Sequence, residues 1–359
     1  MFIKDLGWDA YFEAQWNAEA RGTCVAARVI AQQRGMWRIA GNFPECWAEP
    51  TGKLRLAAEE GGPWPAVGDW VAAENCISGA NTTIQNVLSR RSQFSRKEAG
   101  KRIAEQVVAA NADQAVIVAG LDGDFNPRRI ERYLAQCWDS GARAAIVLNK
   151  ADRCADVEEC AKGIESLAMG APVFVLSART GTGISEFEAS LQKGETVVFL
   201  GSSGVGKSTL VNRLLRRDEQ ATRDVRASDS RGRHTTTARE LFLLPNGALV
   251  IDTPGLRELQ LWDAGEGVAH TFTEIDELAA HCKFRNCSHA GEPGCAVAAA
   301  LQSGDVDPQR LASLRKLQRE QEFLLRKTNS EKQHEHKKRI KILFRQVRRN
   351  SNSKDKNKT

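Results

Sequence analysis

The sequence predicts a multidomain chain with an N-terminal OB-type β-barrel, a central α/β domain with a parallel sheet, and a C-terminal helical domain. Three observations support this fold class. Short alternating segments fill about 22–92, β-branched apolar runs alternate with amphipathic helices over 112–262, and helical periodicity returns over 263–326. With 42% hydrophobic and 27% charged residues, the 359-residue chain can bury such cores, which excludes wholesale disorder and collagen-like or fibrous designs.

The N-terminal region, residues 1–92, is expected to begin with helical turns and to continue as the barrel. Residues 1–21 have helical tendency and no basic extension. From about 22 to 92, short segments separated by Gly, Pro and Asn predict the strands of a small closed antiparallel sheet. Some barrels of this size bind oligonucleotides, but the fold alone does not assign that role. The expected segments are 23–30, 36–40, 53–56, 68–73 and 82–88.

Residues 93–111 are expected to form a basic linker. The stretch 90–102 shows little apolar patterning, and a basic stretch of this kind can contact the phosphate groups of RNA. Its basic residues are Arg90, Arg91, Arg96, Lys97, Lys101 and Arg102.

The central region, residues 112–262, is predicted to fold as a parallel α/β domain. Its apolar runs are too short for buried helices and are rich in β-branched residues, which suits a sheet that is covered on both faces. Between these runs, helices are expected at 127–138, where Asn126-Pro127 marks the start, and at 155–168. The predicted strands are 114–121, 144–148, 172–176, 196–200 and 248–251.

The C-terminal region is predicted to be helical over 263–326, with a long last helix that begins at Asp307-Pro308. The remainder, 327–359, is expected to be a mobile basic tail. Residues 331–359 hold 11 Lys and Arg against 3 Asp and Glu, a net of +8 in a chain whose net charge is +6. Such a block is either a solvated extension or a nucleic-acid contact.

The strongest chemical signal is the motif G-S-S-G-V-G-K-S at 201–208, which lies between the expected strand 196–200 and a helix. Phosphate oxygens need convergent N–H donors, which a glycine-rich backbone supplies, and a helix N-terminus adds partial positive charge. Lys207 would reach the β- and γ-phosphates, and Ser208 would bind magnesium. The position between strand and helix disfavours a mere glycine-rich turn. The expected contacts are Gly201, Ser202, Ser203, Gly204, Val205, Gly206, Lys207, Ser208 and Thr209.

A second motif, Asn149-Lys150-Ala151-Asp152, ends the predicted strand 144–148 at the carboxyl edge of the sheet. The carboxylate of Asp152 can accept hydrogen bonds from N1–H and the exocyclic amine of guanine. Adenine has no donor at N1, so the motif predicts a guanine nucleotide. Lys150 would cover the base, and Asn149 would tie this loop to the phosphate loop. Taken alone, the motif also fits an ordinary helix N-cap. Ser177 and Ala178 fit a backbone contact to the guanine oxygen.

A third motif, Asp252-Thr253-Pro254-Gly255, follows the predicted strand 248–251. Asp252 would hold the magnesium shell, and the N–H of Gly255 would contact the γ-phosphate. Upstream, R-H-T-T-T at 233–237 would supply a hydroxyl group that also binds magnesium; we assign it to Thr236, with Thr235 and Thr237 left open. Without the other motifs, D-T-P-G would be a Pro-Gly turn.

The order of these motifs resembles that of the circularly permuted, small-ribosomal-subunit-dependent GTPases of the RsgA/YjeQ family, which act in ribosome assembly. N-K-A-D and S-A precede the phosphate loop, R-H-T-T-T and D-T-P-G, whereas ordinary GTPases begin with the phosphate loop. The likeness covers about residues 22–326 and includes the barrel and a C-terminal Cys/His cluster. It implies hydrolysis of GTP to GDP and phosphate, a late role in maturation of the small (30S) subunit, and contact with its rRNA.

The Cys/His cluster has the spacing C-x-x-x-x-C-x-H-x-x-x-x-x-C. Three thiolates and an imidazole at these short intervals can close a tetrahedral shell around zinc, which would be structural since no further polar ligand is evident. The alternative is a chance group of buried cysteines. The resembling family uses this spacing for its zinc site. The other cysteines of the nine are scattered and do not suggest a disulfide framework. The expected zinc ligands are Cys282, Cys287, His289 and Cys295.

The residue that follows Gly255 is Leu256, at the place where many GTPases carry a water-orienting Gln. The resembling enzymes also have an apolar residue there, and the nearest replacement here is His234, which we expect to be catalytic. The alternative is a solvent-exposed loop histidine. Because no arginine-type group in cis is evident, we expect slow intrinsic turnover that the subunit stimulates.

The sequence shows no stretch long enough to span a membrane and no secretory signal pattern. A cytoplasmic monomer without membrane contact is therefore expected. Other function classes stay open from the residues alone. One is a GTP-gated RNA-binding protein, or a scaffold with a structural GTP site, acting away from ribosomes. Another is an ATP-dependent enzyme, which Asp152 disfavours.

Overall fold

The N-terminal barrel and the central α/β region belong to one unit of the computed structural model. This first unit comprises Met1–Lys97 with Gln106–Gln260, and the second unit comprises Glu98–Glu105 with Leu261–Thr359. The structure describes residues 2–18, 22–33, 35–75, 81–97, 105–216, 239–252 and 265–328.

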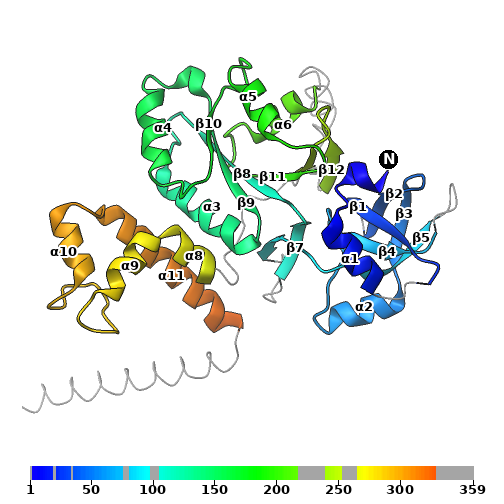
Figure 1. The fold of residues 1–359 in the computed structure, drawn as a ribbon, viewed down its shortest axis with the longest axis horizontal. Coiled ribbons are helices and arrows are strands. Elements are labelled where there is room, and N and C mark those ends of the chain that lie inside the picture. Colours follow the sequence, from blue (N-terminus) through cyan, green and yellow to red (C-terminus); the bar gives the residue numbers. More distant parts are fainter. Residues whose placement is uncertain are drawn as a thin grey trace, which may run out of the picture. The chain divides into compact units, whose positions relative to one another are not determined.

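The barrel closes through pairing of its first strand with its fourth, as the labelled strands of Figure 1 show. The strands follow the order β1-β2-β3-β5-β4, and β4 returns to β1. The β3–β5 pair is parallel and the other neighbours are antiparallel. This arrangement confirms the predicted small barrel of OB type. Its elements are β1 (Val25–Gln33), β2 (Met36–Gly41), β3 (Cys46–Pro50), α2 (Gly52–Glu59), β4 (Trp70–Ala73) and β5 (Thr82–Val87).

One expected strand of the barrel is wrong, because residues 53–56 lie in the helix α2. The alternation in K-L-R-L imitates a strand, but the side chain of Thr51 accepts a hydrogen bond from Leu54 N at 3.4 Å and caps a helix. Leu54 is buried whereas Leu56 is 59% exposed, so a single apolar side chain anchors this helix. The strand at this place in the barrel is β3, which the sequence pattern did not indicate.

Helical turns precede the barrel, as the sequence predicts: η1 spans Ile3–Leu6 and α1 spans Ala10–Ala18. They bring aromatic rings against the barrel. The ring centroid of Trp8 lies 4.7 Å from that of Trp70 in an edge-to-face arrangement, and Phe12 is buried beside them. Such contacts add to the burial of apolar area, so the N-terminal segment is part of the core of the first unit.

A buried arginine holds this segment to the barrel and to the start of the α/β region. Arg28 is 1% exposed; it donates Nε–H to Gly68 O at 3.2 Å, Nη2–H to Asn111 O at 3.2 Å, and Nη1–H to Leu6 O. Burial lowers the pKa of its guanidinium to about 10. These carbonyl groups therefore stabilise the buried positive charge in place of water.

Replacement of Arg28 by Met should lower the free energy of unfolding of the first unit by about 2–4 kcal/mol, because it leaves buried carbonyls without their donors. Urea unfolding followed by tryptophan fluorescence measures this loss. The control is Arg55→Met, whose ion pair with Glu49 is half exposed, with side-chain exposures of 50% and 51%, and which should cost under about 1 kcal/mol. Equal losses in the two variants would contradict the role of Arg28.

Residues 93–111, expected as a basic linker, contain two strands. These are β6 (Gln93–Lys97) and β7 (Glu105–Ala110), which form a two-stranded sheet among the described residues. The basic residues before it are also engaged: Arg90 pairs with Asp69 at 2.8 Å, and Arg91 pairs with Asp113 at 3.0 Å. These two arginines stabilise the fold and are less available to RNA than their sequence context indicates. Lys101 and Arg102 lie outside the described residues.

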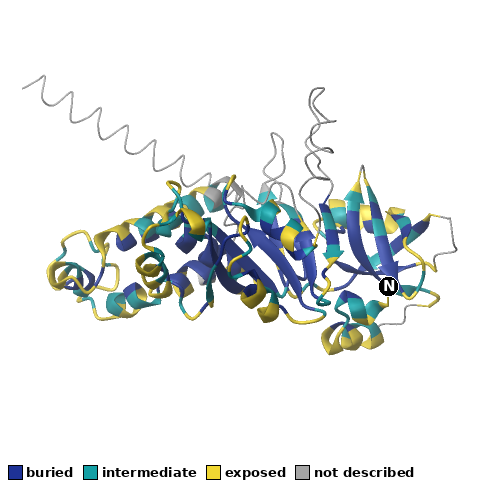
Figure 2. Ribbon diagram, turned by 90° about the horizontal axis from the view of Figure 1, so that it is seen from above, coloured by how far each residue is buried: buried dark blue, intermediate teal, exposed yellow. Residues whose placement is uncertain are grey.

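The α/β region has the predicted parallel sheet, in the order β10-β9-β8-β11-β13 with β12 antiparallel beside β13. The two sheet faces carry separate apolar clusters. Side chains of α3 and α4 pack on one face, and side chains of α5 and α6 pack on the other. Figure 2 shows the central strands of this sheet in dark blue, and β8, β9, β11 and β13 are mostly buried. The elements are β8 (Gln114–Gly120), α3 (Pro127–Ser140), β9 (Arg143–Asn149), η2 (Ala151–Arg153), α4 (Val157–Glu165), β10 (Val173–Val175), α5 (Ile184–Ser190), β11 (Thr196–Leu200), α6 (Lys207–Leu214), β12 (Arg239–Leu243) and β13 (Leu249–Asp252).

The barrel and the α/β region share one continuous sheet. Strand β12 pairs with β1, with Ala31 opposite Glu240 and Gln32 opposite Arg239. Arg38 of β2 adds a contact to Glu240 at 3.4 Å. The sequence predicts two separate sheets, because no local pattern shows that an edge strand of one will pair with the other.

The second unit is helical in the described part, as predicted. Its apolar contacts include Leu311, Leu314 and Leu317, which are buried on one side of the long last helix. Arg310 of that helix donates to Thr271 O at 2.8 Å, and its guanidinium lies 5.0 Å from the ring centroid of Phe272. Residues 329–359 of the basic tail lie outside the described residues. The helices are α8 (Gly265–Thr271), α9 (Thr273–Ala280), α10 (Ala296–Ser303) and α11 (Pro308–Thr328).

No helix in the described ranges is long and apolar enough to cross a membrane.

Candidate nucleotide and metal sites

The sheet topology brings the predicted motifs to one edge. The parallel strands β8, β9, β11 and β13 end at Gly120, Asn149, Leu200 and Asp252. Because the carboxyl ends of parallel strands face the same way, the loops that follow them lie along a common edge. Gly120 is the register partner of Asn149, which places these two strand ends side by side.

The phosphate-loop motif, residues 201–208, runs from β11 into α6 and requires glycine at two positions. Gly201 has φ +142°, and a Cβ there would lie 2.3 Å from Val118 O. Gly206 has φ +97°, and a Cβ there would lie 2.3 Å from Asn149 Nδ2. Any side chain at Gly206 would thus displace the neighbouring motif. The loop is folded closely enough for its backbone to surround a phosphate group.

The ammonium group of Lys207 lies across this loop. Its Nζ donates to Gly201 O at 2.6 Å and to Ser202 O at 2.7 Å. These carbonyl contacts hold the positive charge over the concave side of the loop, where it can meet phosphate oxygens. Ser203, Gly204 and Ser208 are exposed beside it.

Asn149 links three of the predicted motifs. Its side chain is buried; Nδ2 donates to Val205 O of the phosphate loop at 2.8 Å, and Oδ1 accepts from Ala178 N at 2.9 Å. An amide can donate through its nitrogen and accept through its oxygen at the same time. The structure therefore brings N-K-A-D, S-A and the phosphate loop together through one residue.

Asp152 lies in η2, directly after this junction. Its Oδ1 accepts a hydrogen bond from Ser177 Oγ at 2.6 Å, and this bond lowers the pKa of the Asp152 carboxyl. Arg179 lies 3.7 Å from its other oxygen. Asp152 is therefore held as a carboxylate, the form that accepts hydrogen bonds from N1–H and an exocyclic amine.

Lys150 adopts a left-handed backbone conformation, with φ +64°, and reaches back to the preceding strand end. Its Nζ lies 2.5 Å from Asp122 Oδ2, and this hydrogen bond lowers the pKa of the Asp122 carboxyl. Asp122 follows β8, so the loop between β8 and α3 also contacts the N-K-A-D motif at 149–152, the base motif.

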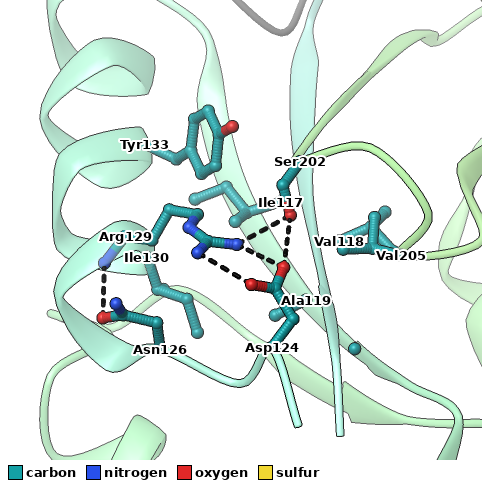
Figure 3. Close-up of a pocket in the computed structure, with 11 residues that line it drawn as sticks. Ile117, Val118, Ala119, Asp124, Asn126, Arg129, Ile130, Tyr133, Ser202 and Val205 are labelled. Atoms are coloured by element: carbon teal, nitrogen blue, oxygen red, sulfur yellow. Dashed lines mark hydrogen bonds and ion pairs between the residues drawn. The ribbon is translucent and has the colours of Figure 1, made fainter. Parts of the chain in front are cut away.

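The same loop contacts the phosphate loop in a small pocket, shown in Figure 3. Arg129 donates to the two carboxylate oxygens of Asp124 at 2.5 and 3.0 Å and to Ser202 Oγ at 2.8 Å. Ser202 Oγ in turn donates to Asp124 at 3.1 Å. The ion pair keeps the pKa of the Asp124 carboxyl below its usual range. The triad fixes the second residue of the phosphate loop.

Sequence reasoning missed Asp122, Asp124 and Arg129. A signal was present, because Asp122-Gly123-Asp124 directly follows a buried parallel strand, which is where such sheets bind ligands.

The third motif is described only at its start. Asp252 is the last residue of β13; it is exposed and is the register partner of Glu240. The expected residues His234, Thr236 and Gly255 lie outside the described residues. The base and phosphate sides of the predicted site are thus described, and the remainder rests on sequence.

The predicted metal ligands come together in the second unit. The ligand atoms of Cys282, Cys287, His289 and Cys295 all lie within 4.8 Å of one another. Cys282 Sγ lies 3.9 Å from Cys295 Sγ, and His289 Nδ1 lies 3.6 and 3.5 Å from these two sulfur atoms. In a tetrahedral site with Zn–S of about 2.3 Å and Zn–N of about 2.0–2.1 Å, the corresponding distances are about 3.8 and 3.6 Å. The cluster is compatible with a zinc site.

The chain around the cluster orients these ligands. The carboxylate of Glu292 accepts from Ser288 N at 2.9 Å and from Ala290 N at 2.8 Å, on both sides of His289. The hydroxyl of Ser288 also donates to Glu292 Oε1, and this side-chain hydrogen bond is the main cause that lowers the pKa of Glu292 to about 2. At the start of α10, Ala298 N donates to Cys295 Sγ at 3.3 Å, which orients this sulfur atom.

Comparison with known proteins identifies relatives across the chain. The family model "RsgA GTPase" matches residues 87–262. The small ribosomal subunit biogenesis GTPase RsgA of Opitutus terrae is 46% identical over 338 residues, which cover 92% of this chain and 92% of that protein.

Two solved structures share the architecture. YjeQ from Thermotoga maritima has a TM-score of 0.62 and 26% identity, over 83% of this chain and 98% of that one. YloQ, described as a circularly permuted GTPase, has a TM-score of 0.58 and 22% identity, over 85% and 97%, and shows likeness of fold.

Proposed function

The chain belongs to the RsgA GTPase family, and from that premise we propose that it binds the small ribosomal subunit and assists its late maturation, hydrolysing GTP to GDP and phosphate with subunit-stimulated turnover. Membership makes it a GTP-hydrolysing enzyme of ribosome biogenesis. The motifs appear in permuted order, with N-K-A-D before the phosphate loop.

The observation that carries the GTP site is the double hydrogen bond of Asn149 to the phosphate loop and to Ala178. In the proposed complex, Asp152 accepts from the guanine base, Lys150 covers its ring, and the backbone of Ser177 and Ala178 contacts its oxygen. Asp152 is already an oriented carboxylate, which supports this role. The phosphates would lie on residues 201–209, at the N-terminus of α6.

Magnesium would neutralise charge on the β- and γ-phosphates when bound. We assign its protein contacts to Ser208, Thr236 and Asp252, and the γ-phosphate contact to Gly255. Ser208 is exposed at the start of α6, and Asp252 is exposed at the end of β13. The loop before α6 follows β11, and β11 and β13 are parallel neighbours that end at the same sheet edge. His234 is proposed to orient the attacking water, on the sequence alone.

Zinc would be held by Cys282, Cys287, His289 and Cys295. The ligand distances support a tetrahedral shell, and four protein ligands leave no open position, so the metal would stabilise the fold and take no part in hydrolysis.

The decisive test measures GTP turnover with purified small subunits, large subunits and unrelated RNA. We expect stimulation of about tenfold or more with small subunits alone, because a partner that orders the site supplies transition-state contacts. Lys207→Ala should abolish hydrolysis in every mixture, whereas Lys193→Ala, whose side chain is 75% exposed, should not. Equal stimulation by any RNA would instead favour a GTP-gated RNA-binding protein acting away from ribosomes.

Asn149→Ala should weaken GDP binding by about tenfold or more, because the phosphate loop and the base loop lose their shared partner. Fluorescent GDP titration measures this affinity. The matched control is Asn246→Ala, because the side chain of Asn246 also bonds backbone groups in both directions. Its Nδ2 donates to Glu188 O at 3.1 Å and to Leu191 O at 3.4 Å, and its Oδ1 accepts from Ala248 N at 3.1 Å, in the turn between β12 and β13. Both variants should lose stability, and only Asn149→Ala should lose GDP. Unchanged GDP affinity in Asn149→Ala would refute the linking role.

A further inference from the structure

A pair of thiols lies directly beside the base motif, outside the metal cluster. Cys154 follows η2, two residues after Asp152, and Cys160 lies in α4. Their Sγ atoms are 4.0 Å apart, and both residues are partly exposed. Two thiols at this separation with access to solvent can be joined by a small movement.

The local fold turns these two side chains toward each other. Cys154 N donates to Ala151 O at 3.3 Å, which closes the turn that carries Asp152. Asp156 then caps α4, accepting from Glu159 N at 3.1 Å. The N-cap of α4 therefore lies two residues after Cys154, and the first turn of the helix brings Cys160 back toward it.

Other described cysteines do not share this arrangement. Cys137 is fully buried, and burial raises the pKa of its thiol, so it is inert. Cys46 is bonded in a disulfide, and Cys24 has no thiol neighbour among the contacts of the described residues. The remaining described free cysteines are the predicted zinc ligands.

The two thiols have different roles. Burial and the neighbouring thiol of Cys154 raise the pKa of Cys160, and the carboxylates of Asp156 and Glu159 add to this effect. A raised pKa makes the thiolate of Cys160 the less populated form. The attack on the oxidant is therefore assigned to Cys154, and Cys160 completes the bond.

We propose that Cys154 and Cys160 form a redox pair, oxidised by a hydroperoxide to a disulfide that weakens guanine-nucleotide binding. The thiolate of Cys154 attacks the O–O bond of hydrogen peroxide and becomes a sulfenic acid, and the leaving oxygen takes a proton as water. The sulfur of Cys160 then attacks Cys154, forms the S–S bond and expels a second water. The two sulfur atoms together lose two electrons, and one peroxide is reduced to two waters.

The expected loss of nucleotide affinity follows from the distance between the two sulfur atoms, which must shorten when the disulfide forms. A disulfide needs an S–S separation of about 2.05 Å, so the sulfur atoms must approach by about 2 Å. Cys154 is attached to the turn that holds Asp152, whose carboxylate is placed by a 2.6 Å hydrogen bond from Ser177. Drawing Cys154 toward α4 moves this carboxylate away from its position beside the S-A loop. This consequence rests on the proposed role of Asp152 in binding guanine.

Formation of the disulfide can be measured from the mass of one tryptic peptide. Trypsin cleaves after Arg153 and after Lys162, so the fragment Cys154–Lys162 contains both cysteines. Full-length protein is treated with stoichiometric hydrogen peroxide, alkylated and digested. We expect this fragment to lose two hydrogens and to escape alkylation, and dithiothreitol to reverse both changes. A fragment that stays alkylated, or that passes to sulfinic acid, overturns the proposal.

The functional step is measured as affinity for fluorescent GDP before and after oxidation. We expect the affinity for GDP to fall by about fivefold or more after oxidation, and to be restored by dithiothreitol. Cys160→Ser should not respond, and Cys24→Ser, a partly exposed cysteine in the barrel region, should respond as the parent does. Loss of affinity in Cys160→Ser as well would assign the effect to other cysteines and overturn the proposal, as would disulfide formation without any change in affinity.

The two hypotheses fail in different ways. If reduced protein does not bind GDP, the assignment of Asp152 is wrong, whereas the mass of the peptide still reports whether the thiols pair.

Discussion

Cys287→Ser should release the metal and unfold the metal-binding part of the second unit, with the largest effect on stability of any single substitution considered for this chain. The segment between α9 and α10 contains the four ligands and no helix or strand of its own, so the metal supplies most of its cohesion. Structural zinc contributes an apparent 10–16 kcal/mol, roughly, to folding of small domains at neutral pH. Metal content, which should fall from one zinc to none, and protease sensitivity of residues 265–328 measure the loss.

The control for this experiment is Cys24→Ser, which replaces a partly exposed cysteine of the first unit and should retain the metal. A chelator added to the parent protein should reproduce the protease sensitivity of Cys287→Ser. GDP binding should stay within a few-fold in both cases, because the predicted nucleotide site lies in the first unit. A variant that lacks zinc but resists protease as the parent does would show that packing of the helices alone holds this unit.

Asp152→Asn should lower the affinity for GDP and GTP by about a thousandfold or more. A carboxylate accepts hydrogen bonds from both N1–H and the exocyclic amine of guanine. An asparagine amide has one acceptor and one donor, so its NH2 group would face an N–H group of guanine, and neither donor would have an acceptor. Xanthine carries an oxygen in place of the amine, so the same substitution should improve binding of xanthosine nucleotides. Competition of GDP, ADP and xanthosine diphosphate against a fluorescent nucleotide measures this change of preference.

The matched control is Asp156→Asn, four residues further on. Asp156 caps α4, and asparagine is an equally good cap, so neither stability nor base preference should change appreciably. If Asp152→Asn kept its preference for guanine, the base would have to be recognised elsewhere. The hydrogen bond from Ser177 would then serve only to close the turn.

Local patterns in the sequence predicted the parallel strands and the metal ligands. Strands β8, β9 and β11 were recognisable because a strand buried on both faces must be apolar throughout, so that it appears in the sequence as a continuous run of apolar residues. The long helix α11 was recognisable from its spacing of leucines. The four metal ligands lie within 14 residues, so their geometry is set by short turns close in sequence.

Patterns that depend on distant partners were wrong or absent. K-L-R-L at 53–56 alternates as a strand does, but the cap at Thr51 makes it helical. The stretch 90–102 shows little apolar patterning, so β6 and its pairing with β7 were not predicted, although Phe94 of β6 and Val108 of β7 are buried in the core. Arg90 and Arg91 could not be assigned to structural ion pairs, since their partners include Asp69 and Asp113, about twenty residues away in sequence.

The sequence by itself determined which chemical groups this protein carries and in what order, because phosphate loops, base motifs and metal knuckles are short and their backbone geometry is local. The tertiary structure alone decided which of them meet. Pairing of β8 with β9 and β11 sets Asn149 against Val205, and it brings Arg129 to Ser202 across 73 positions of sequence. Such contacts depend on strand order, which arises from burial of the whole sheet and is not encoded in any one segment.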